Sequence, residues 1–226
     1  KQYDISKVPP LRDPQMFSIR MGVENEALMA NMLVHQDTNL PTSITKLRPE
    51  LAALAVWTFS HNIKGLEKAT FTRVEVKLRD MCRLGRQIPT IRDEIVLQVV
   101  KQLTQNPSAD ASDRLWRTLA AFLAHFPPSS LFENYLESHL LSVIEDLEQA
   151  VSELQDEVSL ERDGHLAKVP QASLVRSGLT TDSMAPTEVH KKKLNTEEKE
   201  LIHKNTNKII VARTQISWAR HCVRLL

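Results

Sequence analysis

Glycine is scarce in this sequence: only five glycines occur among its 226 residues. Phosphate-binding loops of the Walker and dinucleotide types need several closely spaced glycines, so the scarcity excludes both. No segment alternates apolar and polar residues with a period of two, as a half-buried strand would. We therefore expect helices, joined by loops that proline and asparagine mark, rather than a β-sandwich or a Rossmann-type sheet.

Cysteine is scarcer still. Cys82 and Cys222 lie far apart in the chain, so we expect reduced thiols rather than a disulfide framework. The sequence contains no C-x-x-C pair, no H-E-x-x-H and no G-x-S-x-G motif. His221 is adjacent to Cys222, and adjacent helical residues point about 100° apart, which suits neither a metal site nor a catalytic pair. We predict no metal, no cofactor and no enzymatic activity.

Long hydrophobic runs are also missing. The longest uncharged stretch, residues 51–63, contains Thr58, Ser60 and Asn62 and is too short and too polar to cross a bilayer. Residues 1–14 carry charges and prolines and have no apolar core, so they do not resemble a signal peptide. The chain does not start with Met, and we expect it to be a fragment of a longer cytoplasmic polypeptide without a transmembrane segment.

Acidic and basic residues are segregated along the sequence. The formal net charge is only +1, which does not suit a nucleic-acid binder, so we expect no nucleic-acid partner. Residues 64–92 hold eight basic and three acidic residues, a balance of +5. Residues 133–163 hold ten acidic residues and one arginine, a balance of −9, and residues 188–224 hold nine basic and four acidic residues, a balance of +5. The chain, although nearly neutral overall, therefore has strongly charged segments of both signs.

Apolar residues recur at helical spacing along most of the chain, which predicts an all-α, compact bundle of about six or more helices. The predicted helices span residues 24–34, 49–65, 71–86, 90–105, 112–126, 130–158 and 195–226. Thr90 with Asp93, and Ser130 with Glu133, are predicted capping pairs. The expected buried anchors are Leu54, Phe59, Leu78, Ile95, Val99, Trp116, Leu119 and Phe122, and Trp57 is expected to widen the buried stripe of its helix.

The stretch before the last helix has a different composition. Residues 164–194 are rich in Ser, Thr and Pro and show no periodicity, which predicts a long flexible excursion, either a disordered linker or an insertion. The predicted organisation is an extended N-terminal segment at 1–23, a helical bundle at 24–163, the linker at 164–194, and a closing helix of the same bundle at 195–226.

A specific pattern lies between Ile88 and Pro107. It reads R-D-E-I, then Q, K-Q and T-x-N-P at fixed spacing. The residues that carry it are Arg92, Asp93, Glu94, Ile95, Gln98, Lys101, Gln102, Thr104, Asn106 and Pro107. This pattern resembles the signature of the myosin tail homology 4 domain.

Flanking segments extend the resemblance. Ser112, Arg114 and Trp116 resemble the family's Ser…Arg-Gly-Trp segment, although Leu115 replaces the glycine. The match also includes residues 42–47, 55–59, 126–129, 135–136 and 218–225. The main departure is the long stretch between residues 141 and 216, where the family has a short link. We expect the signature residues Arg92, Asp93, Glu94, Gln98, Lys101, Gln102, Asn106, Pro107 and Trp116 to be mostly structural.

The resemblance implies a non-catalytic helical module of a cytoskeletal motor or regulator. Domains of this kind bind microtubules or cargo, and a FERM or GTPase-activating domain follows in some parent chains. Two alternatives stay open on the residues alone. One is a GTPase-activating module with Arg92, Arg114 or Arg86 as an arginine finger. The other is a structural spacer that carries a short coiled coil at residues 144–158.

The predicted partner surface is a basic row on the third predicted helix. Arg79, Arg83 and Arg86 follow one another at spacings of four and three residues and therefore share a face. Arg73 and Lys77 lie on a neighbouring row. A basic row beside an apolar stripe is usually just a solvated helix face, while the resemblance implies docking on a microtubule or another acidic protein surface.

Overall fold

The computed structural model describes residues 11–17, 32–67, 71–164 and 196–226. Most of the helix predicted at 24–34 and nearly all of the predicted excursion at 164–194 lie outside the described residues. The chain divides into two compact units, each described by itself below. The first comprises Lys1–Leu147 and Thr214–Leu226, and the second comprises Glu148–Arg213. The predicted domain ranges stay a prediction.

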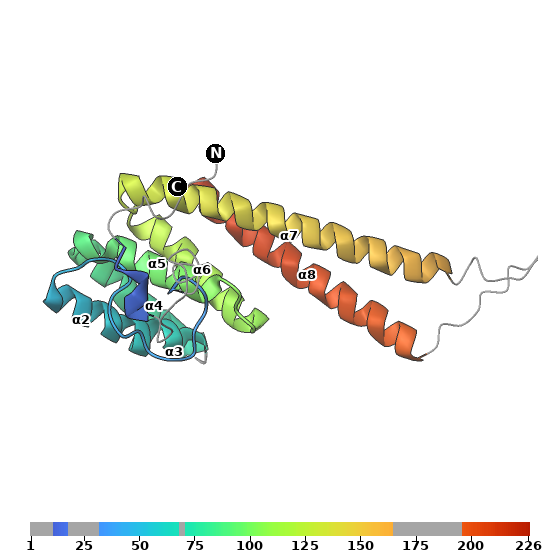
Figure 1. The fold of residues 1–226 in the computed structure, drawn as a ribbon, viewed down its shortest axis with the longest axis horizontal. Helices are drawn as coiled ribbons and strands as arrows, with labels where there is room; N and C mark the ends of the chain where they lie inside the picture. Colours follow the sequence, from blue (N-terminus) through green and yellow to red (C-terminus); the bar gives the residue numbers. More distant parts are fainter. Residues whose placement is uncertain (1–10, 18–31, 68–70, 165–195) are drawn as a thin grey trace, which may run out of the picture. The chain divides into compact units, whose positions relative to one another are not determined.

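Most of the described residues are helical, and the all-α prediction is confirmed (Figure 1). The longer helices are α2 (Pro49–Thr58), α4 (Phe71–Gln87), α5 (Arg92–Leu103), α6 (Ala109–His125), α7 (Ser130–Gly164) and α8 (Thr196–Leu225). Shorter elements are η2 (Pro14–Phe17), η3 (Phe59–Ile63), α3 (Lys64–Glu67) and η4 (Pro89–Ile91). The described residues contain one isolated β-bridge, between Leu11 and Thr45, and no longer strand.

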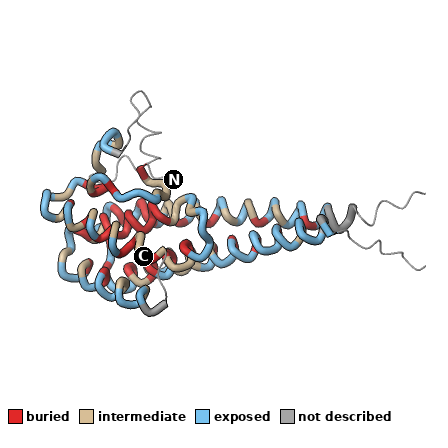
Figure 2. The backbone as a smooth tube through the Cα atoms, turned by 90° about the horizontal axis from the view of Figure 1, so that it is seen from below, coloured by how far each residue is buried: buried red, intermediate tan, exposed pale blue. Residues whose placement is uncertain are grey.

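Helix α5 is the centre of the first unit, as predicted for the helix that carries Gln98. Every residue from Glu94 to Gln102 is buried, and Figure 2 shows buried residues gathered along the helices of this unit. Thr90 does not cap α5, because it lies inside the turn η4 and Ile91 occupies the cap position without a side-chain bond. Asp93 accepts hydrogen bonds from the backbone and hydroxyl of Ser129 instead.

Helix α6 packs on α3, α4 and α5 through an apolar face. The face consists of Leu115, Trp116, Leu119, Phe122 and Leu123, all buried. The helix starts three residues earlier than predicted, because Ser108 accepts a hydrogen bond from the Ala111 backbone at 3.2 Å and so caps it. The N-cap of α7 lies one residue before the predicted Ser130: the Ser129 hydroxyl accepts a hydrogen bond from the Phe132 backbone N–H.

The segment predicted as one helix over 49–65 is continuous but contains a π-turn. α2 passes into the π-helical η3 and then into α3, so Gly65 does not end the helix. Ala52, Ala55 and Thr58 form the buried side of α2. Consequently Trp57 is 52% exposed rather than part of the buried stripe. Of the predicted anchors, Leu54 and Leu78 are half-buried because they flank their helices' buried sides; the other six are buried.

The second unit is a pair of helical segments, the distal part of α7 and the proximal part of α8. Val151 and Val158 are buried on α7, and Ile209 and Ala212 are buried on α8. Asn205 donates a hydrogen bond from its side chain to Glu157 at 3.3 Å, which links the two segments. The stripe that suggested a coiled coil is therefore covered within this chain at Val151 and Val158.

Candidate functional site

The predicted basic row lies on the exposed side of α4. Arg73, Arg79, Arg83 and Arg86 are exposed, whereas Met81 on the same helix is fully buried. Within the described part of the chain, no hydrogen bond or ion pair engages any of the four guanidinium groups. Helix α4 holds five basic residues and two acidic ones, Glu75 and Asp80, so its formal charge is 5 − 2 = +3. We define the basic face as Arg73, Arg79, Arg83 and Arg86.

Lys77, the fifth predicted residue of this row, has a different environment. Its side chain is half-buried, and its ammonium group donates a hydrogen bond to the backbone oxygen of His61. A Cβ atom added at Gly65 would lie 2.8 Å from the Lys77 Nζ atom, so the absence of a side chain at Gly65 makes room for the lysine. Lys77 thus braces α4 against η3.

Exposed apolar residues lie near the basic face. Val76, on the outer side of α4, is 50% exposed. The Trp57 ring stacks on the His61 ring, with centroids 4.8 Å apart and planes 18° apart. His61 is the residue whose backbone Lys77 contacts, so the aromatic pair is a neighbour of α4. Sequence reasoning placed Trp57 in the core and missed this pair.

Among the signature residues, Glu94 makes the densest set of contacts. Its side chain has no exposed surface. One carboxylate oxygen accepts the Ile44 backbone N–H at 2.9 Å and the Gln98 amide at 2.8 Å. The other accepts the Thr45 N–H and the Thr45 hydroxyl, both at 2.6 Å. Burial raises the pKa of Glu94, and these hydrogen bonds oppose the rise.

Gln98 and Arg92 also hold parts of the bundle together. The Gln98 amide donates to the backbone oxygen of Ala55 at 3.1 Å and so joins α5 to α2. Its own carbonyl oxygen is buried and has no partner among the described residues. Arg92 donates to the backbone oxygen of Gly85 at 2.7 Å and lies over the Phe126 ring at 5.9 Å. Both side chains therefore connect helices inside the first unit.

Side chains at the end of α5 hold the segment around residues 34–36 in place. The Lys101 ammonium group donates to the backbone oxygen of Val34, and burial lowers the pKa of Lys101 to about 8. Gln102 accepts the Gln36 N–H at 3.0 Å and donates to the Gln36 backbone oxygen at 3.1 Å. Its amide also donates to Glu67 at 2.9 Å.

The last two members of the signature shape the turn after α5. The Asn106 amide donates to the Gln102 backbone oxygen at 2.8 Å, and its side-chain oxygen accepts the Ser108 N–H at 2.8 Å. Gln105 has a positive φ of 57° in this turn. Pro107 is exposed and follows directly.

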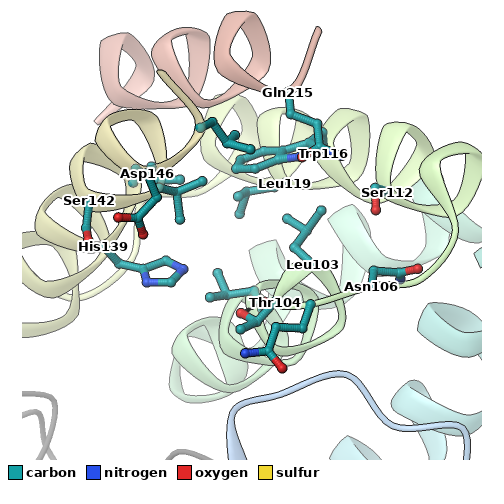
Figure 3. A pocket seen from close by; sticks show the side chains of 15 residues that line it. Leu103, Thr104, Asn106, Ser112, Trp116, Leu119, His139, Ser142, Asp146 and Gln215 are labelled. Carbon is teal, nitrogen blue, oxygen red and sulfur yellow. Dashed lines mark hydrogen bonds between the residues drawn. The ribbon is translucent and has the colours of Figure 1, made fainter. Parts of the chain in front are cut away.

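A pocket of about 530 Å³ opens in the first unit, beside Trp116 (Figure 3). Trp116 is only 4% exposed, and its ring lies with Leu103 and Leu119 in the pocket wall. His139 and Asp146 on α7 face the pocket from another side (Figure 3). Burial lowers the pKa of His139, and the nearby Asp146 acts against that shift. The sequence carried no signal for this pocket, because its lining comes from four helices.

The described residues contain no group of three or more His, Cys, Asp or Glu side chains that could hold a metal ion. No helix in the part of the chain that the structure describes is long and apolar enough to cross a membrane.

The three candidate arginine fingers differ in their surroundings. Arg92 is bonded to the Gly85 backbone as described above, and Arg114 donates to the backbone oxygens of Leu66, at 2.9 Å, and Glu67. These two guanidinium groups hold helix ends in place. Arg86 is exposed on the basic face.

Comparison with known proteins finds a matching family model. The family model described as MyTH4 domain, which is the myosin tail homology 4 family, matches residues 78–170. This range contains the complete signature and confirms the predicted resemblance. The chain also matches curated proteins, whereas no solved structure matches it.

The relatives include myosins and a kinesin. The high molecular weight form of myosin-1 from Acanthamoeba castellanii is 29% identical over 141 residues, which are 62% of this chain and 9% of that protein. Unconventional myosin-XV from Homo sapiens is 42% identical over 52 residues, 23% of this chain and 2% of that protein. Kinesin-like protein KIN-14I from Oryza sativa subsp. japonica is 23% identical over 128 residues, 54% of this chain and 10% of that protein. In these three relatives, the chain spans a tenth or less of the full length.

Proposed function

We propose that this chain, which matches the MyTH4 family model over residues 78–170, is a non-catalytic interaction module of a cytoskeletal motor or regulator, located in the cytoplasm. Its proposed partner is an acidic protein surface such as the C-terminal tails of tubulin in a microtubule. The observation that carries the proposal is the basic face of α4, where four exposed arginines have no partner among the described residues. Cargo proteins with an acidic surface are the alternative partner of the same face.

Electrostatics makes the basic face suited to this role. Exposed guanidinium groups without internal ion pairs are free to pair with carboxylates, and arginine does so through two parallel hydrogen bonds. Attraction between exposed charges raises the association rate and is screened over about 8 Å at physiological ionic strength. We therefore expect binding that weakens steeply as salt is added.

The test is co-sedimentation of the chain with stabilised microtubules at low ionic strength. Reversing Arg79, Arg83 and Arg86 to Glu changes the charge of α4 by six and should abolish pelleting, because attraction becomes repulsion. The three side chains are exposed, so the helical circular-dichroism signal should be unchanged.

A matched control reverses three exposed lysines on α8, Lys199, Lys204 and Lys208, to Glu. This variant has the same net charge as the α4 variant and should still pellet. Equal pelleting of wild type and a folded α4 variant would exclude the basic face. Equal loss in both variants would show that only net charge matters. If wild type never pellets, an acidic cargo protein takes the place of the microtubule.

GTPase activation is the alternative function, and among the three candidate arginine fingers only Arg86 lies on the basic face. Arg86 is exposed, whereas Arg92 and Arg114 are bonded to backbone oxygens and would have to break structural contacts to reach a nucleotide. GTP hydrolysis by small GTPases in the presence of the chain discriminates the two functions. Stimulation that Arg86→Ala removes would favour the catalytic function, and no stimulation is expected.

A further inference from the structure

The pocket beside Trp116 is a second candidate binding site, separate from the basic face and opposite to it in charge. Its wall is formed by apolar side chains from the end of α5, the middle of α6 and α7. These side chains are Val100, Leu103, Trp116, Leu119, Leu140, Val143 and Leu147. Leu103, Val143 and Leu147 are only half-buried, so apolar surface stays open to a ligand. The volume of about 530 Å³ lies in the range typical of ligand pockets.

A few polar groups face the pocket without partners. The Ser112 side chain is 3% exposed, yet no hydrogen bond to another described residue engages its hydroxyl. The Asp146 carboxylate is exposed and has no ion-pair or hydrogen-bond partner in the described ranges. Figure 3 shows the Asp146 carboxylate and the His139 ring directed toward the same opening.

The charge at the pocket is negative. Asp146 is the only lining residue that has a carboxylate or ammonium group. A ligand that matches the pocket therefore combines an apolar body with one positive charge.

We propose that this pocket binds a partner peptide that inserts an apolar side chain against Trp116 and pairs an adjacent arginine or lysine with Asp146. The apolar side chain fills the open wall formed by Leu103 and Val143. The Ser112 hydroxyl bonds to the peptide backbone. A partner with a basic apolar segment would thus bind here while an acidic surface binds the basic face.

The experiment compares three peptides that differ in one side chain. The probes are acetylated, amidated Leu-Leu-Arg-Phe, the same peptide with citrulline, and the same peptide with glutamate. Binding to the full chain is followed by NMR through the indole N–H of Trp116. We expect the arginine peptide to shift this signal and to bind about two- to fivefold more tightly than the neutral citrulline peptide. The glutamate peptide should bind most weakly.

Two variants with matched charge changes identify the contact. Asp146→Asn should remove the preference for arginine over citrulline. Glu145→Gln lies next to it on α7 but does not line the pocket, and it should keep the preference. Equal affinity of all three peptides, shifts that leave Trp116 unmoved, or an unchanged preference in Asp146→Asn would each overturn the proposal, as would no binding at all.

Discussion

Replacement of Glu94 by glutamine tests the structural role of the signature most sharply. Each carboxylate oxygen of Glu94 accepts one backbone N–H, that of Ile44 or that of Thr45, together with one side-chain donor. Glutamine has one carbonyl oxygen and one NH₂ group. Whichever position the NH₂ takes, one buried backbone N–H loses its acceptor and faces another donor.

The magnitude follows from this count. A buried donor left without an acceptor costs about 1–3 kcal/mol, and the second hydrogen bond lost on that side adds about 1 kcal/mol. We therefore expect Glu94→Gln to lower the free energy of unfolding by about 2–4 kcal/mol. Urea unfolding followed by circular dichroism measures this loss, provided that the slope against urea is unchanged.

The control is Glu137→Gln, a substitution of the same kind at an exposed position of α7. It should change the stability by less than about 0.5 kcal/mol. A loss below about 1 kcal/mol for Glu94→Gln would refute the inference that this carboxylate fastens residues 44 and 45 to α5.

Three further substitutions probe the first unit. Gly85→Ala would place a Cβ atom 2.4 Å from the Phe126 ring, and the resulting overpacking should cost about 1–3 kcal/mol, more than the gain from the higher helix propensity of alanine. In the control Gly65→Ala, the new Cβ atom meets only the flexible end of the Lys77 side chain. The control should therefore lose much less stability in the same urea assay. Trp116→Ala should cost about 3–5 kcal/mol, and a loss below about 1 kcal/mol would mean that the ring contributes little to the core. The pKa of Lys101, about 8, lies below its ordinary 10.5, so the unfolded chain binds more protons between these values and stability rises with pH there. Lys101→Met should remove that rise, and parallel pH dependence of the two proteins would contradict it.

Helical periodicity predicted most of the fold, because helices such as α6 bury an apolar stripe, although the central helix α5 is buried on every side from Glu94 to Gln102. It failed where backbone geometry intervened. Thr90 falls inside the turn η4 and so cannot cap α5, and the π-turn at Phe59–Ile63 carries the helix past Gly65. Trp57 was misplaced because its size suggests burial, while the contacts of α2 are made by the small residues Ala52 and Ala55.

The site was only partly predictable, for a different reason. The spacing of the arginines in α4 is local, so their shared exposed face could be predicted from the sequence. The backbone N–H groups that Glu94 binds lie 49 and 50 residues away along the chain, and Lys101 contacts a residue 67 positions away, so no local pattern reveals these contacts. The pocket beside Trp116 likewise depends on four helices meeting.

Photo-crosslinking tests the central proposal most directly. Val76 lies on the outer side of α4 among the arginines and is 50% exposed, so p-benzoylphenylalanine at this position keeps every positive charge of the basic face. Ile210 on α8 is 57% exposed and gives the matched control. With microtubules at low salt, the probe at position 76 should form a covalent adduct with tubulin, and the probe at position 210 should not. Adducts from position 210 alone, or none from position 76 while the chain pellets, would contradict docking through α4.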